Sequence, residues 1–572
     1  MNTKLTPEFL RQQIIGIDSS FTTPFGERLM VYCDYTASGR CLSFVEKYLQ
    51  SLQRNYANTH TEDDITGRSM TRLLQQAETA IKKSVNAGPD GRIIAHGTGA
   101  TGAIDKLQQI LGISLAPVSR EKLDHCLNDF FGEEKADAFR QHHQQRQPVV
   151  FVGPYEHHSN EISWRQGMAT VVEVNLDASG GIDLLHLEEL LQDPRYLDRY
   201  RIGSFSAASN VSGRISAVHD IARLLHKHNA IAVFDYAASA PYVEINMDPP
   251  MDADGSDPSL DAVFISPHKF LGGPGSSGIL VFKQQLYRRD LPPTLAAGGT
   301  VDYVSPLDQD FIADIEEREK PGTPGVLQLI KAALTFQIKD EITPATIEEY
   351  EQKMLQQAFT RWLAHPQIEI MGNTDPEKRV GIVSFNIRSP RGRYLHPKLL
   401  TALLNDLFGI QSRAGCSCAG PYGHTLLGID LKESEKHRHW VREGYGGIKP
   451  GWCRVGFHYT MDAAETDYII EAVEFLADHG YRFLSLYDFD LCSGAWEHKN
   501  QIPLSDCLSV ACALDISQVE PFALPAATRI EYYRQNLNKA HTLAEELAQQ
   551  QGDNCCQNQL EGELAELQFF DY

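Results

Sequence analysis

Lys269 stands in a setting that points to covalent chemistry. Residues 261–280 read DAVFISPHKFLGGPGSSGIL, and the apolar run over 262–265 predicts a buried strand that stops at Ser266. His268, Lys269 and a glycine-rich turn follow at once. A partly desolvated lysine at the mouth of a strand loses its proton easily enough to attack a carbonyl and form a Schiff base. A surface lysine in a loop would show the same local pattern, so this stretch by itself leaves both interpretations open.

A carboxylate, Asp235, ends a second short apolar strand in the segment IAVFDYAASA (231–240). The two strands are about thirty residues apart, a separation typical of successive strands in a parallel α/β sheet. Cofactors bind over the carboxyl ends of such strands. Pyridoxal phosphate needs a lysine for its aldehyde and an acid that keeps its ring nitrogen protonated. The spacing of Asp235 and Lys269 therefore favours this cofactor over an isolated helix-cap or turn aspartate.

A phosphate-binding turn is expected upstream of this pair. Residues 91–105 (GRIIAHGTGATGAID) have the pattern of a strand, a glycine-rich turn and the start of a helix. Free backbone N–H groups at a helix start attract phosphate, and Thr98 and Thr101 can add hydroxyl donors. Glycine-rich turns are common, so this signal is weak by itself. The turn lacks the context of a dinucleotide-binding GxGxxG motif, and no Walker lysine follows it.

Taken in order, these segments resemble the fold-type I pyridoxal-phosphate enzymes of the class V aminotransferase group, and in particular the cysteine desulfurases and selenocysteine lyases. The similarity runs from about residue 30 to about residue 475. Its motifs in this chain are VYCDYTASG (31–39), GTGATGAID (97–105), EHHSN (156–160), SNVSG (209–213), SPHK (266–269) and AGGT (297–300). The resemblance implies an α/β fold with a mostly parallel seven-stranded sheet in a large domain and a smaller α/β C-terminal domain.

The resemblance also implies a cofactor site, residue by residue. His157 would stack on the pyridine ring, and Asn210 would contact the ring hydroxyl. Asp235 would pair with the ring nitrogen, and Lys269 would hold the aldehyde. The phosphate site would comprise Gly99, Ala100, Thr101, Ser266 and His268, with Thr300 reaching the phosphate of a neighbouring subunit.

Two further segments bear on the reaction. Residues 411–421 (QSRAGCSCAGP) resemble the desulfurase loop whose Arg-x-Gly-x-x-Cys run carries the persulfide-forming cysteine, which implies Arg413 as a substrate-binding arginine and Cys418 as the nucleophile. The segment CRVGFHYT (453–460) resembles the strand whose arginine, here Arg454, holds the substrate carboxylate. A planar guanidinium fork suits an α-carboxylate, and a cysteine that attacks sulfur must be exposed and partly thiolate. A small buried turn residue is the alternative interpretation of Cys418.

The sequence departs from the family pattern in three places. Ala238 stands where desulfurases usually carry a glutamine, so a hydrogen bond to the ring hydroxyl is expected to be missing. Cys416 adds a second thiol to the loop where relatives often have histidine. A polar insert follows at 431–451, and it suits either a lid or docking element or a solvated loop. These departures bear on the substrate more than on the cofactor.

A zinc site is the competing interpretation of Cys416, Cys418 and His424. Structural zinc usually takes four ligands from two closely spaced pairs. No second cysteine pair follows at a suitable spacing, because Cys555 and Cys556 are adjacent and lie near the C-terminus. The sequence therefore predicts no metal.

The composition is that of a globular enzyme, with 42% hydrophobic and 22% charged residues. A formal net charge of −23 and an isoelectric point near 5.3 argue against nucleic-acid binding. The first residues lack the apolar core of a signal peptide, and no apolar stretch is long enough to span a bilayer. Eleven cysteines without a framework indicate reduced thiols and a cytoplasmic location.

The alternation of strand-like and helical stretches predicts the organisation of the chain. The expected parts are an N-terminal arm (1–30), a large cofactor-binding domain (31–305), a small domain (306–480) and a helical C-terminal extension (481–572). Separate helices are expected within an insertion near 115–147 and over 325–365, 463–478 and 526–550, with strands near 380–388 and 452–459.

These features together predict a homodimeric pyridoxal-phosphate enzyme acting on a small amino acid. The predicted reaction removes sulfur from L-cysteine and leaves alanine and a persulfide on Cys418, with a sulfur-acceptor protein as a further expected partner. An aminotransferase, epimerase or β-lyase would use the same scaffold without Cys418. A non-catalytic, cofactor-bearing protein is the alternative of another class, and the complete pair of Asp235 and Lys269 speaks against it.

Overall fold

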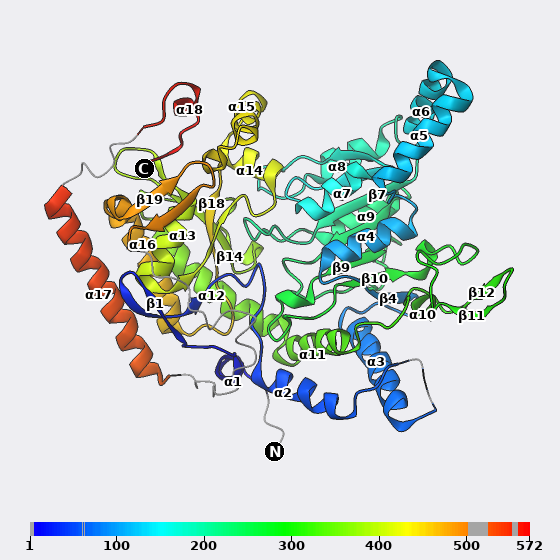
Figure 1. Ribbon diagram of the computed structural model, residues 1–572, viewed down its shortest axis with the longest axis horizontal. Coiled ribbons are helices and arrows are strands. Elements are labelled where there is room, and N and C mark those ends of the chain that lie inside the picture. The colour runs from blue at the N-terminus through cyan, green and yellow to red at the C-terminus, as the bar shows by residue number, and fades with distance from the viewer. Residues whose placement is uncertain (1–4, 60, 62, 501–523, 552–558, 572) are drawn as a thin grey trace. The chain divides into compact units, whose positions relative to one another are not determined.

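The computed structural model describes residues 5–59, 61, 63–500, 524–551 and 559–571 (Figure 1). The chain divides into two compact units. The sheet unit comprises Ser38–Asn210 and Arg214–Ile347, and the C-terminal unit comprises Met1–Ala37, Val211–Gly213 and Glu348–Tyr572. The structure thus divides the chain at Ala37 and Ile347, whereas the sequence pattern placed divisions near residues 30 and 305.

The sheet unit is built on a seven-stranded sheet with the order β4-β10-β9-β8-β7-β5-β6. The strands are β4 (Gly91–Ala95), β10 (Ile279–Lys283), β9 (Ala262–Ile265), β8 (Ile231–Asp235), β7 (Arg201–Ser206), β5 (Val149–Val152) and β6 (Thr170–Glu173). β10 runs antiparallel to both of its neighbours, β4 and β9, and the other neighbouring strands of the sheet pair in parallel. The fold-type I expectation of a mostly parallel sheet is confirmed.

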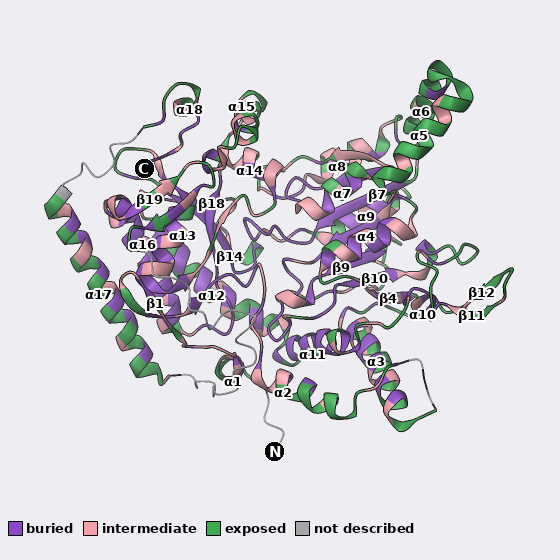
Figure 2. Cartoon of the chain, in the orientation of Figure 1, coloured by how far each residue is buried: buried purple, intermediate pink, exposed green. Residues whose placement is uncertain are grey.

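Burial of the central strands explains the unbroken apolar sequences of β5 and β9. Every residue of β5, β7 and β9 is buried, as the purple sheet in Figure 2 shows. Helix α4 (Ala100–Ile110) packs on β9 and β10, and α9 (Val218–Lys227) packs on β8. A strand that is covered in this way has no solvent face, so it reads as a continuous hydrophobic run rather than an alternating one.

The strand order positions the chemistry-bearing residues. β8 and β9 are parallel neighbours, with Asp235 opposite Phe264. β7 lies on the other side of β8, with Ser206 opposite Asp235. The carboxyl ends of these strands therefore meet at one edge of the sheet, where ligands bind in open α/β folds.

The insertion near 115–147 forms helices of its own, as predicted. α5 (Pro117–Phe131) and α6 (Glu133–Arg146) are joined at Gly132, whose φ of 76° is in the left-handed region that favours glycine. Both helices are largely exposed (Figure 2). Arg140 on α6 donates to Asp124 on α5 at 3.0 Å and helps to hold the pair together.

The C-terminal unit contains a four-stranded antiparallel sheet with the order β13-β14-β18-β17. The strands are β13 (Ile368–Ile370), β14 (Ile382–Ile387), β18 (Trp452–Gly456) and β17 (Arg413–Gly415). The helices predicted over 325–365 and 463–478 form as α11 (Val326–Ile342), α12 (Pro344–Trp362) and α16 (Ala463–His479), of which α11 belongs to the sheet unit.

The insert at 431–451 folds into helix α15 (Leu431–Arg442) and the 3-10 turn η6 (Gly446–Ile448). The end of the chain covers it, because Leu560 and Leu567 join Ile448 in one buried cluster. The last strand, β21 (Phe570–Asp571), pairs in parallel with β15 (Tyr394–Leu395). The 3-10 turn is therefore packed against the end of the chain, whereas α15 is mostly exposed and buries only His437.

The C-terminal extension contributes a long packing helix, α17 (Ala526–Gln551). Its buried positions are Arg529, Tyr533, Asn536, Ala540, Ala544 and Leu547. Steps of three and four residues place these side chains on one stripe of the helix. The Tyr533 ring stacks on Tyr468 of α16 with ring centroids 4.2 Å apart. Within the described part of the chain, none of the helices has the length and hydropathy needed to cross a membrane.

Two adjacent tyrosines of α17 test this packing. Tyr533 is 3% exposed and Tyr532 is 39% exposed. Tyr533→Ala should lower the free energy of unfolding by about 3 kcal/mol, because a large buried ring and its stacking partner are separated. Tyr532→Ala is the matched control and should cost less than about 1 kcal/mol. Urea denaturation followed by circular dichroism measures both, and equal losses would contradict the packing of α17.

Candidate active site

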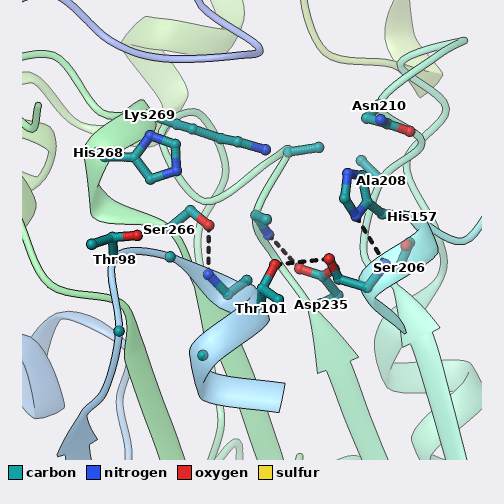
Figure 3. A pocket seen from close by; sticks show the side chains of 17 residues that line it. Thr98, Thr101, His157, Ser206, Ala208, Asn210, Asp235, Ser266, His268 and Lys269 are labelled. Atoms are coloured by element: carbon teal, nitrogen blue, oxygen red, sulfur yellow. Dashed lines mark hydrogen bonds between the residues drawn. The ribbon is translucent and has the colours of Figure 1, made fainter. Parts of the chain in front are cut away.

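A cavity of about 450 Å³ opens at the carboxyl ends of the strands in the sheet unit (Figure 3). The predicted cofactor contacts that line it are Gly99, Ala100, Thr101, His157, Asn210, Asp235, Ser266, His268 and Lys269. Ala238 also lines it, so a methyl group stands where the sequence pattern led us to expect a glutamine amide. The fold thus brings together residues that are up to 170 positions apart in the chain, from Gly99 to Lys269.

One side of the cavity is an anion cradle. Gly99 is the N-cap of α4 and no side chain caps this helix start. Ser266 Oγ accepts a hydrogen bond from the Ala100 N–H at 2.8 Å. A Cβ at residue 99 would lie 3.1 Å from Ser266 Oγ and 3.2 Å from His268 Nε2, so glycine allows this close approach. An uncapped helix start with adjacent hydroxyls is a favourable site for a phosphate group.

Lys269 and His268 lie in the 3-10 turn η3 (Pro267–Lys269) directly after β9. Burial of the imidazole, with the nearby Lys269 charge, lowers the pKa of His268 to about 4. His268 is therefore a neutral ring near pH 7 and adds no positive charge beside the lysine. The turn is held by the Gly39 N–H, which donates to the His268 carbonyl at 2.9 Å.

Asp235 is buried at the end of β8, on the floor of the cavity (Figure 3). Burial raises the pKa of its carboxyl, whereas the Ala237 N–H and the Lys269 charge lower it. The Ala237 N–H donates to Asp235 Oδ1 at 2.8 Å. A buried carboxylate with a single neighbouring lysine is poised to pair with one further cationic donor.

His157 begins the short 3-10 turn η2 (His158–Asn160), and its Nδ1 accepts the Ser159 N–H at 3.1 Å. The neutral ring consequently carries its proton on Nε2. Ser159 Oγ shares a hydrogen bond with Thr101 Oγ1 at 2.7 Å, which links this turn to the start of α4. His157 and Asn210 line the same cavity as Lys269.

Glu156 supports the cavity, and the sequence analysis assigned it no role. Its carboxylate is fully buried and accepts the Ser206 N–H at 2.8 Å, the Ser206 hydroxyl at 2.6 Å and the Asn160 amide at 2.7 Å. Burial raises its pKa to about 7, and the Asp235 charge adds to the effect. The signal in the sequence was an acidic residue directly before His157 in EHHSN, shortly after an apolar strand.

Two of the predicted site residues, Arg413 and Arg454, face each other across β17 and β18 in the C-terminal unit. Arg413 Nε donates to Asp34 Oδ2 at 2.9 Å, and an N–H of Arg454 donates to Asp34 Oδ1 at 3.0 Å. Asp34 belongs to the segment VYCDYTASG, and the sequence analysis assigned it no role. The three side chains form a cluster of two guanidinium groups and one carboxylate.

Cys418 and Cys416 are both exposed thiols in the turn between β17 and helix α14 (Gly420–Leu427). The turn closes with the Ala419 N–H donating to the Cys416 carbonyl at 3.0 Å. Ser417 and Cys418 have φ values of 51° and 56°, which are uncommon for residues with a side chain. The Trp452 indole anchors the turn by donating to Ser417 Oγ at 3.1 Å.

Two further sequence predictions concern Thr300 and a metal site. Thr300 does not line the cavity, and its hydroxyl donates to the Ala297 carbonyl at 2.7 Å within its own turn. Among the described residues, no group of three or more histidine, cysteine or acidic side chains is arranged to hold a metal ion. Cys555 and Cys556 lie outside the described residues.

The comparisons with known proteins agree with this architecture. The sequence model of the family described as aminotransferase class-V matches residues 136–469, more than half of the chain. A probable cysteine desulfurase of Halalkalibacterium halodurans is 27% identical over 397 residues, which is 68% of this chain and 84% of the relative. A probable cysteine desulfurase of Streptomyces coelicolor is 25% identical over 451 residues, covering 78% of this chain and 91% of the relative.

Solved structures share the fold. The apo cysteine desulfurase of Thermococcus onnurineus aligns with a TM-score of 0.62 and 21% identity, covering 84% of this chain and all of that protein. The cysteine desulfurase CsdA of Escherichia coli aligns with a TM-score of 0.60 and 19% identity, covering 82% and 98% of the two chains. With its family match, its parallel sheet and its strand-end cavity, this chain belongs to the aminotransferase class-V family and has the fold-type I architecture.

Proposed function

We propose that this protein is a pyridoxal-phosphate-dependent cysteine desulfurase that converts L-cysteine to alanine and leaves the sulfur as a persulfide on Cys418. The observation that carries the cofactor assignment is the cavity in which Lys269, Asp235 and the start of α4 converge. The exposure of Cys418 in a glycine-flanked turn supports the sulfur chemistry. The curated relatives named as probable cysteine desulfurases support the same substrate.

The residues of the cavity fit the cofactor in charge and in hydrogen-bonding groups. The uncapped start of α4, with the Ser266 and Thr101 hydroxyls, suits the phosphate, and a Cβ at Gly99 would fill that cradle. Asp235 suits the protonated ring nitrogen. Pyridoxal phosphate, when bound, supplies an aldehyde for the lysine and an electron sink for bond cleavage at the substrate carbons.

The chain's own groups would then handle protons and orientation. Lys269 Nζ would carry the proton that leaves the substrate α-carbon. His157 would cover the ring and keep its Nε2–H available as a donor, because Nδ1 is occupied by the Ser159 N–H. Arg454 would hold the substrate carboxylate with its planar fork of donors, and Arg413 would assist it.

Cys418 would perform the step that distinguishes a desulfurase. Its thiolate would attack the sulfur of L-cysteine, a new S–S bond would form, and the substrate C–S bond would break. The bonding electron pair would stay with the substrate, which would take up a proton to give alanine. Aminotransfer, epimerisation and β-elimination need the lysine and the carboxylate clamp but no thiol, so the alternatives differ in their dependence on Cys418.

We further propose that the protein works as a homodimer. The hairpin of β11 (Val301–Val304) and β12 (Gln309–Phe311) follows the AGGT segment directly and exposes Tyr303, Val304 and Leu307, the last of them to 98%. Apolar side chains gathered on an exposed hairpin suit a protein interface. A molar mass of one chain by light scattering would contradict the dimer. The described cysteines are free thiols, which supports a reducing compartment such as the cytosol.

The first prediction from the proposed function tests the cofactor lysine. Purified protein should be yellow, and borohydride should bleach the visible band because it reduces the bond between Lys269 and the cofactor. Lys269→Ala should abolish turnover and leave no reducible bond. Lys283→Ala, at the end of β10, is a control that should keep the band. A Lys269→Ala protein that turns over like the parent would sink the assignment.

The second prediction concerns the pH dependence of the buried carboxyl. Because the pKa of Glu156 is raised in the folded state from 4.5 to about 7, its contribution to stability is present below pH 4.5 and is lost as pH rises through about 7. Between pH 5 and pH 8, the parent should lose about 2 to 3 kcal/mol more stability than Glu156→Gln, which cannot ionise. Urea denaturation at both pH values measures this difference. Parallel pH profiles for the two proteins would refute the role of Glu156 ionisation.

The third prediction separates a desulfurase from the other reactions of this scaffold. Cys418→Ser should eliminate alanine and sulfide formation from L-cysteine while the visible cofactor band is retained. Cys416→Ser should have a much smaller effect, and Cys492→Ser is a control with an exposed thiol elsewhere in the same unit. Assays with L-cysteine, and with a keto-acid acceptor, should be run in parallel. Full activity of Cys418→Ser would favour an aminotransferase or lyase instead.

A further inference from the structure

Asp34 occupies the centre of the arginine pair in the C-terminal unit. One carboxylate oxygen accepts from Arg413 at 2.9 Å and the other accepts from Arg454 at 3.0 Å. The Arg454 and Asp34 side chains are nearly buried, whereas the Arg413 side chain is 54% exposed. The three residues make what we call the Arg413–Asp34–Arg454 cluster.

The backbone determines where Asp34 lies. The residue before it, Cys33, donates its N–H to the Gln411 carbonyl at 2.9 Å. The Cys33 carbonyl accepts the Gly456 N–H at 2.7 Å. Gln411 lies two residues before Arg413, and Gly456 lies two residues after Arg454. The opening segment of the chain is therefore pinned on both sides to the strands that carry the two arginines.

The charge of the cluster follows from its members. Two guanidinium groups face each other across β17 and β18, and a single carboxylate lies between them. At neutral pH the cluster carries one net positive charge, because an arginine stays protonated in proteins. One carboxylate of a ligand neutralises this charge, whereas a second carboxylate finds no partner within the cluster.

We infer that Asp34 is a specificity-determining and positioning residue that limits this clamp to ligands with one carboxylate. Asp34 orients the buried Arg454 and offsets the charge of Arg413. The clamp then favours monocarboxylate amino acids such as cysteine over dicarboxylates of similar size. The inference rests on the proposed function for its substrate, but it concerns charge selection and can be measured without turnover.

The test compares two simple probes, propionate and succinate, in the full-length holoenzyme by isothermal titration calorimetry. Asp34→Asn removes the offsetting charge and leaves two uncompensated guanidinium groups. The preference for succinate is measured as the dissociation constant of propionate divided by that of succinate. This ratio should rise about tenfold in the variant. Added salt should reduce the change, because Arg413 is half exposed.

Two further variants separate charge from structure. Asp34→Asn combined with Arg413→Gln restores one net positive charge, so the ratio should return towards that of the parent although two contacts are lost. Asp34→Glu keeps the charge on a longer side chain and should leave the ratio within about twofold of the parent. Asp488→Asn, an exposed carboxylate on the hairpin strand β19 (Tyr487–Asp490), is the matched control.

The outcomes are distinct. A ratio that is unchanged in Asp34→Asn, or that is not restored in the double variant, overturns the inference. Formation of alanine from L-cysteine by the parent is assayed separately. If the parent forms no alanine while the ratio shifts as expected, the proposed reaction fails and the charge selection by Asp34 stands.

Discussion

Burial of Asp235 beside Lys269 is the constraint on which the cavity depends. A carboxylate at the end of a covered strand is stable only with donors and a positive charge nearby, and the Ala237 N–H and the lysine supply them. β8 and β9 must therefore be parallel neighbours, since their carboxyl ends carry the two residues. Glu156 and Ser206 add further buried polar groups at the end of β7. Both carboxylate oxygens of Glu156 accept a hydrogen bond from Ser206. The apolar strands of the sheet bury Asp235, whereas Lys269 is only partly buried at the cavity.

The glycine-rich turn at the start of α4 is needed for a separate, steric reason. The helix start approaches Ser266 and His268 so closely that a side chain at residue 99 would contact both. The pKa of His268 is low because the ring is desolvated and lies next to the Lys269 charge. A phosphate-sized anion is thus offered backbone dipoles and hydroxyls rather than a cluster of formal charges.

The C-terminal unit shows how an extension outside the family motifs becomes part of a fold. Helix α17 buries one stripe against α16, and the last described residues cover the insert that follows the Cys418 turn. The sequence of the insert is polar, yet Ile448 is buried because Leu560 and Leu567, which are distant in the chain, pack against it. The sequence pattern left a lid, a docking element and a solvated loop open, and the structure shows an exposed helix followed by a turn that packs on the end of the chain.

Sequence patterns were enough to predict the strands that carry Asp235 and Lys269, the turn before α4, the helices of the insertion and the long helix near the C-terminus. These follow from local signals, namely unbroken apolar runs, glycine at tight approaches and three-to-four residue spacing. The folded structure was needed to show that Glu156 lies beneath the cavity, that Asp34 joins Arg413 to Arg454, and that Thr300 bonds within its own turn. Each of these contacts depends on which strand or backbone group lies next to the residue in the folded chain. Local patterns in a single sequence do not predict such neighbours.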